Sequence, residues 1–186
     1  MILHLGIVGV SACGVRHLPR CVRPAPQAYG SRIGPMRVAV GADHAGVALK
    51  ADVVRMLREM QHACDDLGTA GEGSVDYPDY AERVARGVAA GDYDRGILIC
   101  GTGIGMAIAA NKVAGVRAAP VTDVDVARLA REHNDANVLA LGARLVGRER
   151  ALELVRVFLE TPFAGGRHDR RVQKIAALEA RGADAD

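Results

Sequence analysis

The sequence predicts an α/β protein, a doubly wound three-layer α/β/α sandwich around a five-stranded parallel sheet. From residue 36 onward, short runs rich in β-branched residues alternate with longer segments of helical periodicity, which is the pattern of parallel βαβ units. The run RGILIC at residues 95–100 is apolar on both faces, as expected of a central strand that helices cover on both sides. Both observations favour one Rossmann-like domain.

Each element follows from its own residues. The expected strands lie at residues 37–42, 62–66, 95–100, 117–121 and 137–142, and the second of them has the weakest pattern. The expected helices lie at residues 46–60, 78–91, from the glycine loop to about 111, 123–132, 147–160 and 168–181. Apolar spacings of three and four predict the first helix, Pro78 and Gly91 bound the second, and Thr122 is a suitable N-cap for the fourth.

Residues 36–186 are expected to form a single domain, and residues 1–35 a disordered or non-native extension. The extension holds four of the chain's 24 Lys and Arg residues and none of its 22 Asp and Glu residues, so the domain itself carries a charge of −2. A secretory signal or an organellar transit peptide remains possible for this segment, although the basic start of the first and the Ser-rich amphipathic pattern of the second are missing. The domain is expected to begin near Met36.

Composition excludes several classes of protein. Aromatic residues make up 3% of the 186 residues and tryptophan is absent, so no base-stacking surface for nucleic acid is expected. No apolar run is long enough to span a bilayer. Cys64 and Cys100 are isolated, with no metal-ligand spacing, which indicates a reducing, cytoplasmic setting and neither a disulfide framework nor a metal site.

Polar and glycine-rich segments follow the predicted strands. GADHAG follows the first, CGTGIG the third, VTDVD the fourth and GARLVG the fifth. Ligands of doubly wound sheets bind beyond the carboxyl ends of the strands, so we expect these segments to form one rim that carries the site. Asp43 and His44 then lie near Cys100 and Thr102. REHNDAN at 131–137 precedes the fifth strand and is expected at the opposite rim of the same chain.

Three glycines alternate in the loop after the third strand, at Gly101, Gly103 and Gly105. Such a loop ahead of a helix presents unpaired N–H groups and the positive end of the helix to an anion. The dinucleotide fingerprint is not met, because Met106 stands where its third glycine belongs, and no Gly-Lys-Ser/Thr triplet indicates an ATP-binding loop. Cys100 is either a buried packing thiol or, as a thiolate beside a helix N-terminus, a base.

Five motifs occur in order along the chain: GADHAG, DYPDYA, ICGTGIGMAIAANK, REHNDAN and GGRHDRRV. In this order and at these separations they resemble the type B ribose-5-phosphate isomerase family, which also holds galactose- and allose-6-phosphate isomerases. The resemblance covers about residues 36–180. It implies an aldose–ketose isomerase, without metal or cofactor, that interconverts ribose 5-phosphate and ribulose 5-phosphate through an enediolate in the pentose phosphate pathway.

The resemblance assigns proton abstraction to Cys100. It places Thr102 at the enediolate, together with the other residues of the glycine loop, which are Gly101, Gly103, Ile104 and Gly105. Some relatives carry Ser in place of the cysteine and use a Glu a few residues on. Because Ile104 stands near that position, this chain resembles the cysteine type.

Four further residues receive roles from the resemblance. His133 resembles the residue that opens the furanose ring, and Asn134 resembles a partner of the sugar hydroxyls, although a His at a helix end also fits an ordinary capping cation. Asp43 is expected to bind sugar hydroxyls or to orient a neighbour, and a purely structural Asp is the alternative. Tyr77 resembles a residue of the site wall.

Phosphate recognition favours arginine, because the guanidinium is permanently charged and bidentate. Arg167 and Arg171 lie four apart and are expected to project on one side, with His168 and Arg170 pointing elsewhere. The resemblance assigns both arginines to the phosphate and places His44 and Arg144 near it. By itself, RHDRR also fits a solvated basic face.

Because His133 and the arginine pair are expected far from Cys100 within one chain, the resemblance to a family with shared sites implies a homodimer, or a homotetramer. A six-carbon sugar phosphate, such as allose or galactose 6-phosphate, is the alternative substrate, since one extra CHOH is a small difference to read from sequence. A phosphate- or nucleotide-binding module without catalysis is a second alternative, and it would need neither Cys100 nor His133.

Overall fold

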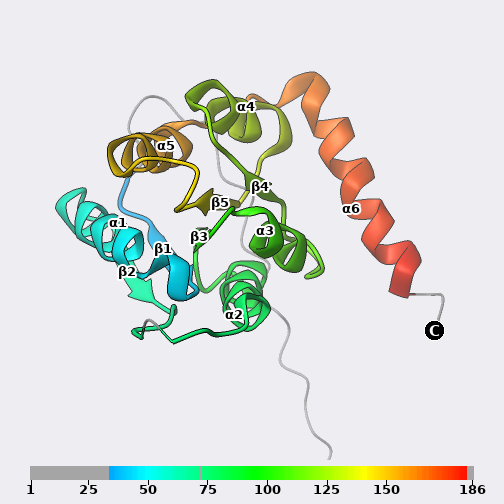
Figure 1. The fold of residues 1–186 in the computed structure, drawn as a ribbon. Helices are drawn as coiled ribbons and strands as arrows, with labels where there is room; N and C mark the ends of the chain where they lie inside the picture. Colours follow the sequence, from blue (N-terminus) through cyan, green and yellow to red (C-terminus); the bar gives the residue numbers. More distant parts are fainter. Residues whose placement is uncertain (1–33, 72, 184–186) are drawn as a thin grey trace, which may run out of the picture.

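Within the residues that the structure describes, 34–71 and 73–183 of this computed structural model, five parallel strands form one sheet in the order β2-β1-β3-β5-β4 (Figure 1). The strands are β1 (Arg37–Ala42), β2 (Ala63–Asp66), β3 (Arg95–Cys100), β4 (Ala118–Pro120) and β5 (Val138–Gly142). The expectation of a disordered or non-native extension falls on residues 1–33, which lie outside the described residues, and on 34 and 35.

The helices alternate with the strands along the chain. They are α1 (Val47–Glu59), α2 (Tyr77–Ala90), α3 (Ile104–Ala110), α4 (Val124–Asn134), α5 (Arg148–Glu160) and α6 (Asp169–Ala183). Two short 3-10 turns, η1 (His44–Gly46) and η2 (Gly166–His168), precede α1 and α6. The predicted fold class is confirmed, and every predicted element is present with ends that differ by at most two residues.

One predicted cap is wrong. Asp123, not Thr122, is the N-cap of α4, because its Oδ1 accepts the N–H of Asp125 across 2.8 Å. The helix begins one residue later than the sequence indicated, so the acceptor that faces the second helical N–H is the Asp123 carboxylate. An ion pair with Arg150 at 3.0 Å also holds this carboxylate.

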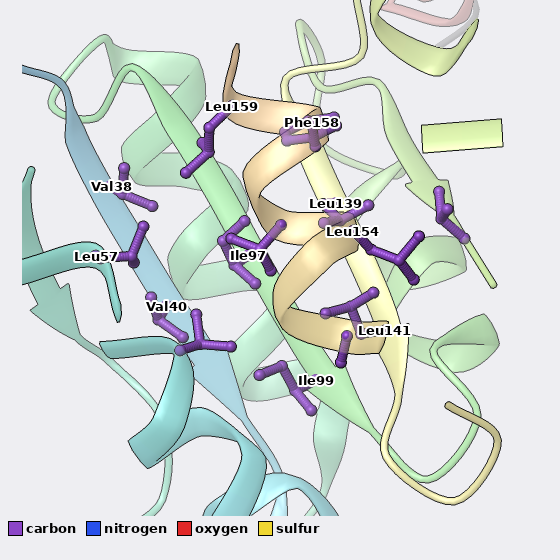
Figure 2. Close-up of a cluster of buried hydrophobic side chains, with 14 of the residues drawn as sticks. Val38, Val40, Leu57, Ile97, Ile99, Leu139, Leu141, Leu154, Phe158 and Leu159 are labelled. Carbon is purple, nitrogen blue, oxygen red and sulfur yellow. The ribbon is translucent and has the colours of Figure 1, made fainter. Parts of the chain in front are cut away.

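The core has one cluster on each face of the sheet, and the larger cluster lies between the sheet and the helices α1, α4 and α5. Alternate strand residues point to this face, and Figure 2 shows their branched side chains, with Ile97 and Leu139 at the centre, packed against Leu154 and Phe158 of α5. Phe158 is fully buried. A period of two along each strand therefore sends the bulky side chains to one face.

The opposite face of the sheet is built mostly from small residues and is covered by α2 and α3. A Cβ on Gly41 or Gly96 would lie 2.8 Å from the Val84 side chain, so glycine in β1 and β3 allows α2 to approach closely. Cys100 is the last strand residue on this face. The sheet thus delivers its sulfur toward α3.

Helix α6 lies outside the two helix layers and extends along the edge of the sandwich (Figure 1). Its contact with the body includes the Glu179 carboxylate, which accepts the N–H of Gly115 across 2.9 Å. Ile175 and Leu178 remain 39% and 62% exposed. None of the helices in the described part of the chain is long and apolar enough to cross a membrane.

Candidate active site

The carboxyl ends of β1 and β3 meet at the point where the chain winds to either side of the sheet. The chain leads from β1 outward to β2 on one side, and from β3 to β4 and then β5 on the other side. The N–H of Asp43, the residue after β1, donates to the Ile99 carbonyl across 3.1 Å, so Asp43 lies beside Cys100 as the topology predicted. A topological switch point of this kind is where doubly wound folds bind ligands.

Cys100 is 5% exposed, and a backbone donor is directed at its sulfur. The N–H of Gly103 donates to Sγ across 3.1 Å. An N–H group pointed at sulfur stabilises negative charge there, because the donor dipole opposes that charge. The loop therefore directs a hydrogen-bond donor at the buried Cys100 sulfur.

Backbone crowding fixes the shape of the glycine loop. Gly103 has a φ of 78°, in the left-handed region, and a Cβ there would lie 3.0 Å from the Leu141 carbonyl carbon. Gly142 on β5 approaches the loop even more closely, since its Cβ would lie 2.7 Å from the Thr102 backbone. Thr102 is left exposed at the tip, with its Oγ1 accepting the Ile104 N–H at 3.4 Å. Sequence reasoning missed Gly142, because its role depends on a neighbour 40 positions away.

Tyr77 forms one wall beside the loop. A Cβ on Gly105 would lie 2.7 Å from the ring carbon that bears the Tyr77 hydroxyl, so the ring packs flush against the glycine. Tyr77 is 40% exposed at the start of α2. Tyr77 therefore lies beside the glycine loop.

Asp43 and His44 follow β1 and face the same rim. The Asp43 side chain is buried, and its Oδ1 accepts the N–H of Ala45 across 2.9 Å, which caps the η1 turn. His44 Nδ1 accepts the N–H of Val75 at 3.4 Å, so the ring proton of a neutral His44 resides on Nε2. Val75 is a further residue that sequence reasoning missed, since it acts through its backbone alone.

Arg144 follows β5 and lies against the loop. A Cβ on Gly101 would be 3.5 Å from Arg144 Cδ, and the Arg144 N–H donates to the Gly101 carbonyl at 3.1 Å. The guanidinium is exposed at this rim, next to the exposed Leu145. Arg144 therefore belongs with Cys100 and not with the arginines of the last helix.

A second cluster gathers where α4 ends and η2 begins. The N–H of Ala164 donates to the Glu132 carbonyl across 3.0 Å, which ties the segment before η2 to the last turn of α4. The imidazoles of His133 and His168 stack with centroids 4.2 Å apart and planes 7° from parallel. Arg167 and Arg171 are exposed on the same segment, and both lie near enough to His168 to lower its pKa.

The turn that carries His133 and Asn134 is held by two arginines. Buried Arg131 donates to the Ala136 carbonyl at 2.6 Å and pairs with Asp135 at 2.8 Å, and Arg117 donates to the Asn134 and Asp135 carbonyls. Burial lowers the pKa of Arg131, and the Asp135 carboxylate opposes that effect. The backbone at this helix end is therefore rigidly anchored.

The two clusters lie at opposite ends of β5. Cys100 is in register with Gly142 at the carboxyl end, whereas α4 ends at Asn134, just before Val138 at the amino end. At about 3.3 Å per residue, the strand separates them by on the order of 13 Å. His133 and Cys100 of one chain therefore lie apart. The position of REHNDAN before the fifth strand predicted this separation.

Comparison with known proteins identifies the family of the chain. A sequence profile of the ribose/galactose isomerase family matches residues 38–175. Ribose-5-phosphate isomerase B of Escherichia coli is 48% identical over 145 residues, which are 78% of this chain and 97% of that protein. The chain belongs to the ribose/galactose isomerase family. It is an isomerase.

Solved structures of this family share the fold. A ribose-5-phosphate isomerase B from Clostridium thermocellum superposes with a TM-score of 0.78 at 50% identity, over 79% of this chain and 99% of that one. A ribose-5-phosphate isomerase B from Mycoplasma genitalium, solved with bound ribulose 5-phosphate, superposes with a TM-score of 0.75 at 44% identity, over 77% and 96% of the two chains. The match spans nearly the whole of each relative.

Proposed function

We propose that this chain interconverts ribose 5-phosphate and ribulose 5-phosphate by opening the furanose ring and moving a proton between C2 and C1. Membership of the family, with a cysteine at the end of β3 and a glycine loop around it, is the observation that carries the proposal. In this reaction the Cys100 thiolate takes the C2 proton of the open aldehyde and returns it to C1.

The enediolate formed between these steps carries negative charge on oxygen. The first turn of α3 presents backbone N–H groups that have no acceptor within the helix, and Thr102 adds a hydroxyl beside them. Asp43, His44 and Tyr77 surround the same rim and are proposed to contact the sugar. His133 and Asn134 are proposed to act on the ring oxygen and the hydroxyls.

We also propose a homodimer with shared active sites. Cys100 with Arg144 and His133 with Arg167 occupy opposite rims of one chain, so a second copy is needed to bring such groups to one substrate. A homotetramer made of two such dimers would keep the same sites.

Exposed apolar side chains support a second copy as the occupant of this region. Ile104 and Ile108 on α3 and Leu145 after β5 are more than half exposed around the Cys100 rim. A groove of about 420 Å³ also runs between α6 and the edge strand β4, with Ile175 and Leu178 on its α6 side. Exposed apolar patches near a half-formed site are typical of interfaces.

Substrate choice is tested by comparing turnover of ribose 5-phosphate, allose 6-phosphate and galactose 6-phosphate on one preparation. The proposal expects the highest kcat/KM for ribose 5-phosphate. A higher kcat/KM for either six-carbon sugar phosphate would change the assigned substrate but not the assigned reaction. No turnover of any of the three would favour a binding module without catalysis.

The interface is tested by Ile175→Asp and Leu178→Asp, with Gln173→Asp as the matched control on the same helix. The apolar variants are expected to sediment as monomers and to lose activity together with assembly, while the control stays dimeric and active. A dimeric, active Leu178→Asp variant would rule out this face.

We propose the cytoplasm as the place of the reaction. Cys64 and Cys100 are both free thiols, and thiols remain reduced in that compartment.

A further inference from the structure

His168 is an imidazole that the proposed reaction leaves without a role. It is 7% exposed in the η2 turn, although its neighbours Arg167, Asp169 and Arg170 are exposed. The sequence predicted that His168 points away from the side that Arg167 and Arg171 share. In the structure its ring turns inward and lies on His133, whereas Arg167 and Arg171 are exposed.

The face of the His168 ring supports His133. The two rings are 4.2 Å apart at their centroids and 7° from parallel. Within the part of the chain that the structure describes, the His133 side chain makes no hydrogen bond, and its aromatic contact is the stacked His168 ring. A ring that opens a sugar must be held at a fixed angle, since small misplacements reduce the rate strongly.

The edge of the His168 ring contacts a phosphate-binding candidate. Arg167 Nε donates to His168 Nε2 at 3.4 Å, which makes Nε2 the acceptor and leaves the ring proton on Nδ1. Burial lowers the pKa of His168, and His133, Arg167 and Arg171 lower it further, while Asp169 raises it. Both arginines beside His168 and the burial of its ring thus disfavour protonation of this imidazole.

We propose that His168 is a positioning residue that holds the His133 imidazole for ring opening through its face and orients Arg167 toward the phosphate through its edge. This inference rests on the proposed function. It assigns His168 no proton transfer of its own. One side chain then joins the group that opens the ring to a group that grips the other end of the substrate.

The experiment separates ring opening from enolisation. Ribulose 5-phosphate cannot close a furanose ring, because its O5 is esterified, so incorporation of solvent deuterium at C1 needs the Cys100 chemistry without ring opening. Ribose 5-phosphate is cyclic, and its conversion needs both. His168→Ala removes the stacked face and the acceptor, His168→Phe keeps a stacked ring without the acceptor, and Arg170→Ala is the exposed control on the adjacent turn.

His168→Ala is expected to slow turnover of ribose 5-phosphate by about 10- to 100-fold, with deuterium incorporation into ribulose 5-phosphate unchanged within about threefold. His168→Phe is expected to keep most of the turnover rate but to raise KM, because Arg167 loses its acceptor. Arg170→Ala should match the wild type in both assays.

Equal losses in both reactions for His168→Ala, or no loss in either, would overturn the positioning role. Loss of ring-dependent turnover in His168→Phe equal to that in His168→Ala would also overturn it, because the stacked ring would then be irrelevant. If the wild-type chain catalyses neither reaction, the proposed function itself fails, and the two failures are thereby distinguished.

Discussion

The backbone N–H of Gly103 donates a hydrogen bond to Sγ of Cys100 across 3.1 Å. This contact stabilises negative charge on the sulfur and so links the conformation of the glycine loop to the proposed base. Cys100→Ala is expected to lower kcat by about 100-fold or more, because proton transfer needs the thiolate. Steady-state kinetics and calorimetric titration with ribulose 5-phosphate should show lost turnover with retained binding. Near-normal turnover would return Cys100 to a packing role.

Arg167 and Arg171 are exposed and lie beside the stacked histidines. Replacing either by Ala is expected to weaken substrate binding by about 1.5 to 3 kcal/mol, the contribution of a hydrogen bond to a charged group. KM should rise, and kcat should fall as well, because the phosphate supplies binding energy that positions C1 and C2. Lys should restore only part of the loss. An unchanged KM in both Ala variants would leave this segment as a solvated basic face.

Sharing of the site between subunits is tested by mixing two inactive variants, Cys100→Ala and Arg171→Ala. If Cys100 and Arg171 meet across the interface, each mixed dimer has one site with both lesions and one with neither, so activity returns in part. If both residues serve the same chain's site, every site keeps one lesion and activity stays absent. Native mass spectrometry of the mixture must first confirm that subunits exchange.

Gly142→Ala is expected to destabilise the fold and the loop together. Its Cβ would lie 2.7 Å from the Thr102 backbone, which cannot rotate away as a side chain can. Overpacking of this kind costs about 1 to 3 kcal/mol of unfolding free energy. Gly147→Ala is the matched control, since Gly147 has a φ of −61° and open space around it. The midpoint temperature of thermal unfolding and kcat should fall in Gly142→Ala only. Equal values for Gly142→Ala and Gly147→Ala would contradict the crowding argument.

Cys64 is expected to resist alkylation at neutral pH. Burial raises its pKa to about 11, so the thiolate is scarce and the rate should rise tenfold per pH unit until about that value. Because the pKa is raised in the folded state, the associated stability is present below the ordinary thiol pKa and is lost as pH rises toward 11. Peptide mapping after iodoacetamide treatment measures the rate, with the urea-unfolded chain as reference. A plateau near the ordinary thiol pKa in the folded chain would contradict this expectation.

Local patterns in the sequence predicted the fold because strands and helices have fixed side-chain periods of two and about 3.6 residues. The alternation of β-branched runs with helical spacing predicted the order of strands and helices, and the rule for parallel sheets placed Asp43 beside Cys100. The same rule placed His133 at the opposite rim. Roles of individual residues came from the resemblance to a family, since short polar motifs do not by themselves state which side chain touches a substrate.

The tertiary structure alone decided which groups distant in the sequence contact one another. In the structure Asp123, and not the predicted Thr122, caps helix α4. The His168 ring stacks on His133, and Gly142 lies against the Thr102 backbone. The tertiary structure also left the apolar side chains of α6 outside the core, although their spacing is that of an ordinary amphipathic helix. Each of these outcomes depends on packing between segments many residues apart, and periodicity along the chain carries no information about that packing. The sequence by itself therefore determined the scaffold and its two rims, whereas only packing in three dimensions decided the contacts within each rim.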